Sequence, residues 1–211
     1  MGTLDNGAFG HLRGKVGNLV SYTLNGKNVV RELGETTKPP TKPKLANYQK
    51  MAVVNAFLKP ILPFIKLGFA FAIQGTDHNQ HNEAVSYNKR FALQGEYPNI
   101  EMDYSKALLS KGNLPPALLP ATNKLPNGVE FTWQVPADMT YAELCNRAML
   151  LLYFPESKTA LFDLSGARRS ERRDFFPLEP EHLAQIIHAY IAFVGDDRLS
   201  VSDSTWIKKL N

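Results

Sequence analysis

Near the start of the chain, apolar and polar positions follow the pattern of β-strands. Residues 16–23 and 28–33 are rich in Val, Leu and Tyr, and Asn25-Gly26 stands between them. An Asn-Gly pair favours a type I′ turn, whose two central residues both need positive φ, and this turn joins antiparallel strands. The pattern therefore predicts a β-hairpin close to the N-terminus.

Glycine and proline surround this hairpin. Five glycines fall within the first 17 residues, and Pro39, Pro40 and Pro43 fall within residues 34–44. Dense glycine disfavours a packed element, and clustered proline favours an extended connection. We therefore expect residues 1–44 to form a Gly-rich basic arm with a β-hairpin and a Pro-rich linker.

The apolar spacing then changes to a helical one. From Leu45 to Ile65 apolar residues recur every three or four positions, and a second such run covers residues 82–94. Pro60 and Pro63 should kink or split the first helix. Residues 99–110 alternate like a strand. We expect residues 45–113 to form a helical segment plus one strand. The apolar stretch 56–73 is too short and too interrupted to span a bilayer.

Four prolines between residues 114 and 127 mark an expected boundary. Beyond it short strand-like runs return every ten to fifteen residues, at 129–135, 147–154, 159–164, 168–176, 186–194, 199–202 and 206–210. This spacing is typical of an antiparallel sandwich. The predicted fold class is mainly β with a helical middle segment and, over residues 114–211, an immunoglobulin- or fibronectin-like sandwich.

Positive charge is concentrated at the start of the chain. The first 50 residues hold eight Lys or Arg and three Asp or Glu, and since the chain carries +4 overall, the rest sums to −1. Such an arm suits nucleic acid or an acidic neighbouring subunit, and a solvated arm without a partner explains it equally well.

Two groups of residues are candidates for an interface. The first lies in the arm and comprises Arg13, Lys15, Val16, Tyr22, Val29 and Arg31. The second is the arginine-rich run Arg168, Arg169, Arg172 and Arg173, whose guanidinium groups suit phosphates or carboxylates of a neighbour. A solvated turn is the favoured explanation of the second group.

Residues with catalytic or metal-binding chemistry are sparse. Cys145 is the single cysteine, which excludes an intramolecular disulfide and a Cys-rich metal site. His78 and His81 beside Asp77 suit a metal less well than a polar cap at a helix start. Residues 10–16 lack the spacing of a phosphate loop. We therefore predict no catalytic residue, no metal site and no cofactor.

Several motifs resemble a domain-of-unknown-function family abundant in Bacteroidota. They are Gly14-Lys15-Val16-Gly17-Asn18-Leu19-Val20, Asn25-Gly26-Lys27, Phe57-Leu58-Lys59-Pro60-Ile61, Ser86-Tyr87-Asn88, Tyr97-Pro98, Phe131-Thr132-Trp133 and Val201-Ser202-Asp203-Ser204. Lys44 departs from the pattern, which has glutamine there. The resemblance implies a shared N-terminal hairpin, an all-β C-terminal part and no established activity. The opening motif is also similar to that of phage-like structural proteins.

The functional expectation is a non-enzymatic structural or assembly subunit. It would form homo-oligomers, or dock into a larger phage-like or surface particle, through its N-terminal arm. The alternatives are a nucleic-acid-binding module that uses the basic arm and a carbohydrate- or protein-binding sandwich. The first residues do not resemble a secretory signal, so we expect a cytoplasmic protein or one exported as part of a particle.

Overall fold

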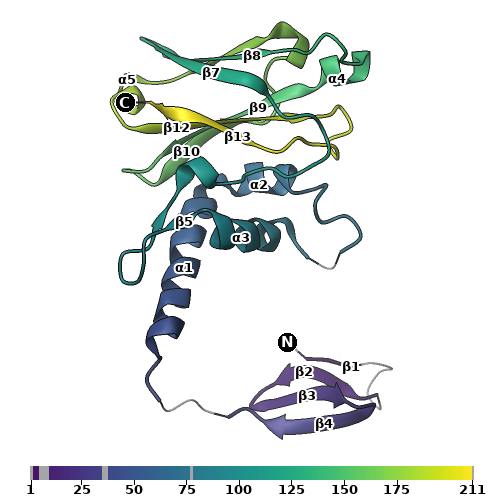
Figure 1. The fold of residues 1–211 in the computed structure, drawn as a ribbon. Coiled ribbons are helices and arrows are strands. Elements are labelled where there is room, and N and C mark those ends of the chain that lie inside the picture. The colour runs from purple at the N-terminus through teal and green to yellow at the C-terminus, as the bar shows by residue number, and fades with distance from the viewer. Residues whose placement is uncertain (1, 5–9, 35–37, 77, 211) are drawn as a thin grey trace. The chain divides into compact units, whose positions relative to one another are not determined.

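The computed structural model describes residues 2–4, 10–34, 38–76 and 78–210 (Figure 1). Gly7 and Asp77, which entered the sequence predictions, lie outside the described residues. The chain divides into two compact units, residues 1–41 and 42–211. This division falls at the start of the first helix, close to the predicted end of the arm, and no second division occurs near residue 114.

The first unit is an antiparallel sheet in the order β1-β2-β3-β4. Its strands are β1 (Thr3–Leu4), β2 (Leu12–Val16), β3 (Leu19–Leu24) and β4 (Lys27–Glu32). Asn25 and Gly26 join β3 to β4 with φ of 49° and 77°, which confirms the predicted hairpin.

The prediction of an extended arm before the hairpin is wrong for residues 12–16. These residues form β2, which pairs with β3 so that Val16 lies opposite Leu19. Gly17 has a φ of 59° and makes the short turn between the two strands. Glycine here permits a second tight turn, rather than preventing a packed element.

The helices follow the proline positions. The helical segment comprises α1 (Lys42–Leu58), the 3₁₀ turn η2 (Lys59–Ile61) and α2 (Leu62–Gly68), so the predicted split at Pro60 and Pro63 is confirmed. Helix α1 begins before Leu45, because Pro43 is tolerated in a first turn, where no intrahelical N–H bond is needed.

The next segment differs from its prediction. Helix α3 (Gln80–Phe91) ends earlier than expected, because β5 (Leu93–Gln94) pairs with β6 (Glu101–Met102). The strand expected over residues 99–110 is reduced to β6 and the 3₁₀ turn η3 (Tyr104–Lys106). Asp103 causes this break, since its carboxylate accepts a hydrogen bond from the Ser105 N–H at 3.2 Å and caps the turn.

Two antiparallel sheets form the C-terminal part. One has the order β10-β9-β12-β13 and the other has the order β11-β8-β7. The bounds are β7 (Leu118–Leu125), β8 (Gly128–Gln134), β9 (Arg147–Phe154), β10 (Thr159–Asp163), β11 (Arg173–Pro177), β12 (Ile187–Val194) and β13 (Thr205–Leu210). Short helical turns α4 (Tyr141–Cys145), η4 (Arg169–Glu171) and α5 (Pro180–Leu183) connect them.

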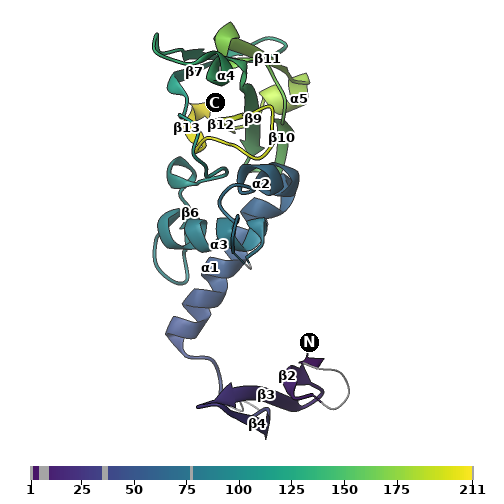
Figure 2. The same ribbon diagram turned by 90° about the vertical axis from the view of Figure 1, so that its right-hand side faces the viewer.

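The second unit has three layers. Figures 1 and 2 show the four-stranded sheet between helices α2 and α3 on one face and the three-stranded sheet on the other. Met149 and Leu151 of β9 face the helices, whereas Leu150 and Leu152 face the second sheet. Because β9 and β12 are buried on both faces, their sequences are continuous apolar runs rather than alternating ones.

The apolar helical segment is part of the first of these two cores. The stretch Lys42–Gly68 is long and apolar enough to cross a membrane by length and composition. However, Phe57, Leu58, Ile61 and Phe64 are buried against the four-stranded sheet. Packing against the sheet therefore accounts for their apolar character.

Candidate interaction surfaces

The N-terminal sheet has almost no core of its own. Among the described residues of the first unit Ser21 is the single buried side chain, whereas Leu4, Val16, Leu19 and Val30 are 54%, 47%, 41% and 55% exposed. A unit of about 40 residues needs extra support when its own core is this small. The exposed apolar surface therefore marks this sheet as a candidate interface.

One face of this sheet carries exposed apolar side chains beside the polar Ser21 and Glu32. In the register of the strands Val16, Leu19 and Glu32 form one cross-strand row, and the next row contains Gly14, Ser21 and Val30. Side chains alternate along a strand, so Val16, Leu19 and Val30 share a face. We call this set the apolar face.

The opposite face is basic. Lys15, Val20 and Arg31 form one row, Tyr22 lies opposite Val29, and Leu24 lies opposite Lys27. The Arg31 guanidinium carbon is 5.9 Å from the centre of the Tyr22 ring, a cation–π distance. We call the set Lys15, Tyr22, Lys27, Val29 and Arg31 the basic face.

The structure thus brings most of the predicted arm residues together. Lys15, Tyr22, Val29 and Arg31 lie on the basic face, whereas Val16 lies on the apolar face. Arg13 is exposed in β2, opposite Thr3 of β1.

Sequence reasoning missed one cation of the basic face, Lys27. It follows the Asn25-Gly26 turn and lies opposite Leu24. The register that a two-residue turn imposes would have placed it on this face.

The arginine-rich run does not form one surface. Arg168, Arg172 and Arg173 are exposed, but Arg169 is 1% exposed. The prediction that all four guanidinium groups could reach a partner is therefore corrected for Arg169. Arg169 lies in the 3₁₀ turn η4, Arg168 and Arg172 flank it, and Arg173 begins β11, so the four side chains do not alternate as expected.

Arg169 is instead a core residue. Its guanidinium donates hydrogen bonds to the Pro115 carbonyl at 2.7 Å and the Pro116 carbonyl at 3.4 Å, and lies 3.7 Å from the centre of the Phe193 ring. Burial lowers the pKa of Arg169 to about 10. These contacts join the connection before β7 to the core between the two sheets.

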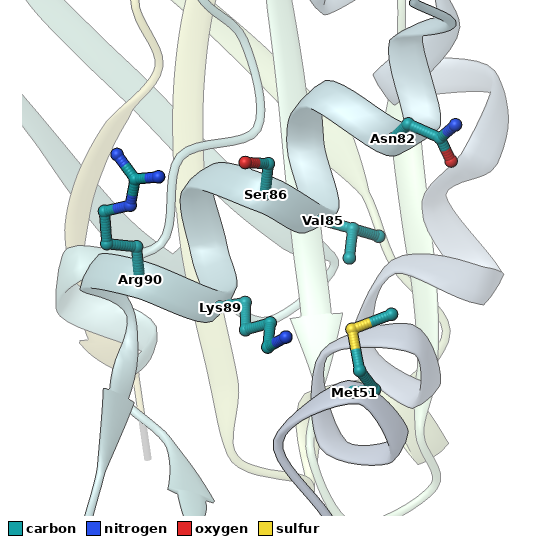
Figure 3. A pocket seen from close by; sticks show the side chains of 6 residues that line it. All are labelled: Met51, Asn82, Val85, Ser86, Lys89 and Arg90. Atoms are coloured by element: carbon teal, nitrogen blue, oxygen red, sulfur yellow. The ribbon is translucent and has the colours of Figure 1, made fainter. Parts of the chain in front are cut away.

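A groove runs along α3 beside α1 (Figure 3). It has a volume of about 470 Å³, and its lining comprises Met51, Asn82, Val85, Ser86, Lys89 and Arg90. Figure 3 shows Val85 and Lys89 pointing towards Met51. Two cations and no acid line this groove, so it favours an anionic group with an apolar part. The sequence analysis did not identify it, although residues 82, 86 and 89 have helical spacing.

An aromatic cluster lies between the helices and the four-stranded sheet. His188 Nδ1 accepts a hydrogen bond from Trp206 Nε1 at 3.2 Å, and its ring is 4.3 Å from that of Tyr104. Tyr190 donates to the Tyr104 carbonyl at 2.7 Å. Burial, assisted by Lys209, lowers the pKa of His188 to about 4. His188 is therefore a buried group that has both a hydrogen-bond partner and a ring partner.

The histidines near α3 have no part in its cap. Asn79 is the N-cap residue, since its side chain accepts a hydrogen bond from the Asn82 N–H at 2.7 Å. Within residues 2–4, 10–34, 38–76 and 78–210, no group of three or more His, Cys, Asp or Glu side chains is placed to hold a metal ion. Cys145 is a half-buried free thiol.

Comparison with known proteins gives a family but no activity. No curated protein and no solved structure significantly matches the chain. A family model described as a family of unknown function (DUF6266) matches residues 11–208, which cover both units apart from the ends. The chain therefore belongs to this family of unknown function, DUF6266.

Proposed function

We propose that this chain is a non-enzymatic structural or assembly subunit that joins copies of itself, or a larger phage-like or surface particle, through its N-terminal sheet. The observation that carries the proposal is the apolar face of a sheet with almost no core. Burial of Val16, Leu19 and Val30 in a contact would supply the apolar packing that the unit lacks.

Two buried groups with altered pKa, His188 and Arg169, support a role without catalysis. His188 and Arg169 are both buried among aromatic rings, and both have packing partners. Neither lines the groove along α3. We therefore propose no reaction for this chain.

The test is a substitution of the apolar face in the full chain. The variant Val16→Thr/Leu19→Thr/Val30→Thr should have a lower mass by light scattering than the unmodified protein at the same concentration. Threonine is favourable to strands but is less apolar than valine or leucine. Val20→Thr/Val29→Thr, on the opposite face, is the matched control and should keep the mass. An unchanged mass of the triple variant, with its sheet intact by circular dichroism, would contradict the proposal.

A second candidate function is nucleic-acid binding by the basic face. Lys15, Lys27 and Arg31 lie with Tyr22 on one face, which combines phosphate-binding cations with an aromatic ring for base stacking. Affinity for single-stranded RNA or DNA should then fall steeply between low and moderate salt. Lys15→Glu/Arg31→Glu should abolish it, and no retention at low salt would remove this candidate.

The fold supports one further classification. Strands β7 to β13 form a three-stranded and a four-stranded antiparallel sheet packed face to face. We propose that they correspond to the expected immunoglobulin- or fibronectin-like sandwich. A carbohydrate- or protein-binding role would follow from that class by analogy of fold.

A further inference from the structure

A hollow of about 460 Å³ opens beside α4 and the connection between β12 and β13. Leu114 and Tyr141 give it an apolar part, and Tyr141 is 81% exposed. Glu143, Asp196 and Asp197 also line it. We call it the acidic hollow. An apolar depression with acidic edges suits an aromatic anchor flanked by cations.

The carboxylates of the acidic hollow favour the ionised state. The backbone N–H of Thr140 lowers the pKa of Glu143, and the backbone N–H of Ser200 lowers that of Asp197, in each case as the largest cause. Glu143 is half-buried and Asp197 is exposed, and in both the hydrogen bonds outweigh the opposing effect of desolvation on the pKa. The hollow therefore presents negative charge at neutral pH.

Cations of the same chain match this negative charge only in part, since Arg169 helps to lower the pKa of Glu143. Within the part of the chain that the structure describes, none of the three carboxylates forms an ion pair. Arg198 follows Asp197 in sequence, but its guanidinium donates to the Leu164 carbonyl and to Ser165 Oγ at 3.3 and 3.0 Å. A cation from another molecule is therefore free to approach the hollow.

A buried polar group also lines the acidic hollow. Asn146 is 5% exposed, and its Nδ2 has no hydrogen-bond partner in the structure. An unpaired buried amide is unfavourable. Because Nδ2 itself has almost no accessible surface, an acceptor from a partner would reach it only after the lining of the hollow shifts.

Complementary groups lie on α1. Lys42, Lys44 and Lys50 are exposed, and Tyr48 is 52% exposed. The Lys44 ammonium is 5.8 Å from the centre of the Tyr48 ring, so the two side chains lie on one side of the helix. No acidic residue occurs between positions 38 and 76, and lysines in a first helical turn are disfavoured by the helix dipole unless anions approach.

The two surfaces lie at opposite ends of the second unit. In both Figure 1 and Figure 2 the first half of α1 extends beyond α3, on the side of the unit away from α4. Helix α1 is attached to the same unit through the buried residues of its second half. In one copy the exposed end of α1 therefore lies away from the acidic hollow, so only a second copy could bring the two surfaces together.

We propose that Tyr48 of one copy docks in the acidic hollow of a second copy, with Lys44 beside the carboxylates. The proposal rests on the assembly function above and adds a second contact to the sheet contact. Because the two partners in the contact are different surfaces, the contact is heterologous and repeats head to tail. The apolar part of the hollow holds the tyrosine ring, and the charges set its orientation.

The native Cys145, which lines the hollow, gives a direct test. Tyr48→Cys in the full chain should form intermolecular disulfides with Cys145 under mild oxidation, seen as a ladder on a non-reducing gel. Cys145→Ser in the same variant should abolish the ladder. Lys59→Cys, also exposed in the helical segment, is the matched control. A ladder no stronger for Tyr48→Cys than for Lys59→Cys would overturn the proposal.

Charge reversal tests the same contact without a cross-link. Lys44→Glu and Asp196→Lys should each weaken self-association at least tenfold, whereas an equimolar mixture of the two should restore it. Asp196 is chosen because Asp197 holds its turn through hydrogen bonds to Leu199 and Ser200. Failure of the mixture to restore association would overturn the proposal, and folding of each variant is checked by its thermal unfolding.

The result of the cross-linking test does not depend on whether the sheet contact exists. The Tyr48→Cys ladder should persist when the apolar face is substituted, because Val16, Leu19 and Val30 are in the first unit. A ladder together with an unchanged mass of the apolar-face variant would contradict the sheet contact and support this one. A lower mass of the apolar-face variant, together with no ladder from Tyr48→Cys, would support the sheet contact and contradict the Tyr48 contact.

Discussion

Protonation of His188 should control how the second unit responds to mild acid. His188 lies on β12 between Tyr153 of β9 and Lys209 of β13, and its ring stacks on Tyr104. Its Nδ1 accepts the hydrogen bond from Trp206, so a proton on Nδ1 would remove that bond. Protonation also places a second positive charge near Lys209.

The size of the effect follows from the two pKa values. Burial lowers the pKa of His188 from 6.5 to about 4. Below pH 6.5 the unfolded chain binds a proton that the folded chain does not take up until pH 4. The free energy of unfolding therefore falls as the pH falls through this range, by about 2 kcal/mol between about pH 7.5 and about pH 5.

The assay is urea unfolding followed by tryptophan fluorescence at a series of pH values. His188→Gln keeps an acceptor for Trp206 but has no ionisable group in this range. The decrease in its free energy of unfolding over this pH range should therefore be about 2 kcal/mol smaller than that of the unmodified protein. His78→Gln, at an exposed position, is the control and should keep the dependence of the unmodified protein. Equal pH dependence of His188→Gln and the unmodified protein would refute the reasoning.

Three further changes test the packing. Phe131→Ala empties a fully buried position between the two sheets and should lower the free energy of unfolding by about 3–5 kcal/mol in urea. Gly112→Ala would force a Cβ against the Val201 carbonyl and should lower the free energy of unfolding by about 2 kcal/mol or more. Gly34→Ala, which has open space around it, is the control and should change the free energy of unfolding little. Equal effects of the two substitutions would contradict the close approach of Gly112 to Val201. Thr140→Ala removes the capping box of α4 and should cost about 1 kcal/mol by thermal unfolding, and no change would show that this cap is dispensable.

Elements fixed by local chemistry were predicted well. The Asn25-Gly26 turn needs two positive φ values, and Pro60 and Pro63 cannot continue a helix, so the hairpin and the split helix are confirmed. Strand β2 was missed because glycines at positions 14 and 17 suit both a flexible arm and a tight turn. Pairing with β3, a contact outside the segment itself, decides between the two.

The candidate surfaces were predicted in part for a related reason. Alternation along β3 and β4 places Tyr22, Val29 and Arg31, three of the candidate arm residues, on one face, and the structure adds Lys27. Arg169 was misplaced because nothing in the run around it distinguishes a buried guanidinium from an exposed one. Its partners, the Pro115 and Pro116 carbonyls, lie more than fifty residues away in the chain.

The amino-acid sequence is sufficient to predict the mainly β character, the helical middle segment, the turn positions and the basic start of the chain. These depend on backbone preferences and periodicity within a few residues. The tertiary structure alone decided that the helices and both sheets share one unit, that β9 and β12 are buried on both faces, and that the acidic hollow assembles beside α4. Such features depend on contacts between segments far apart in the chain, which local patterns do not specify because the same apolar run packs equally well against a helix or a sheet.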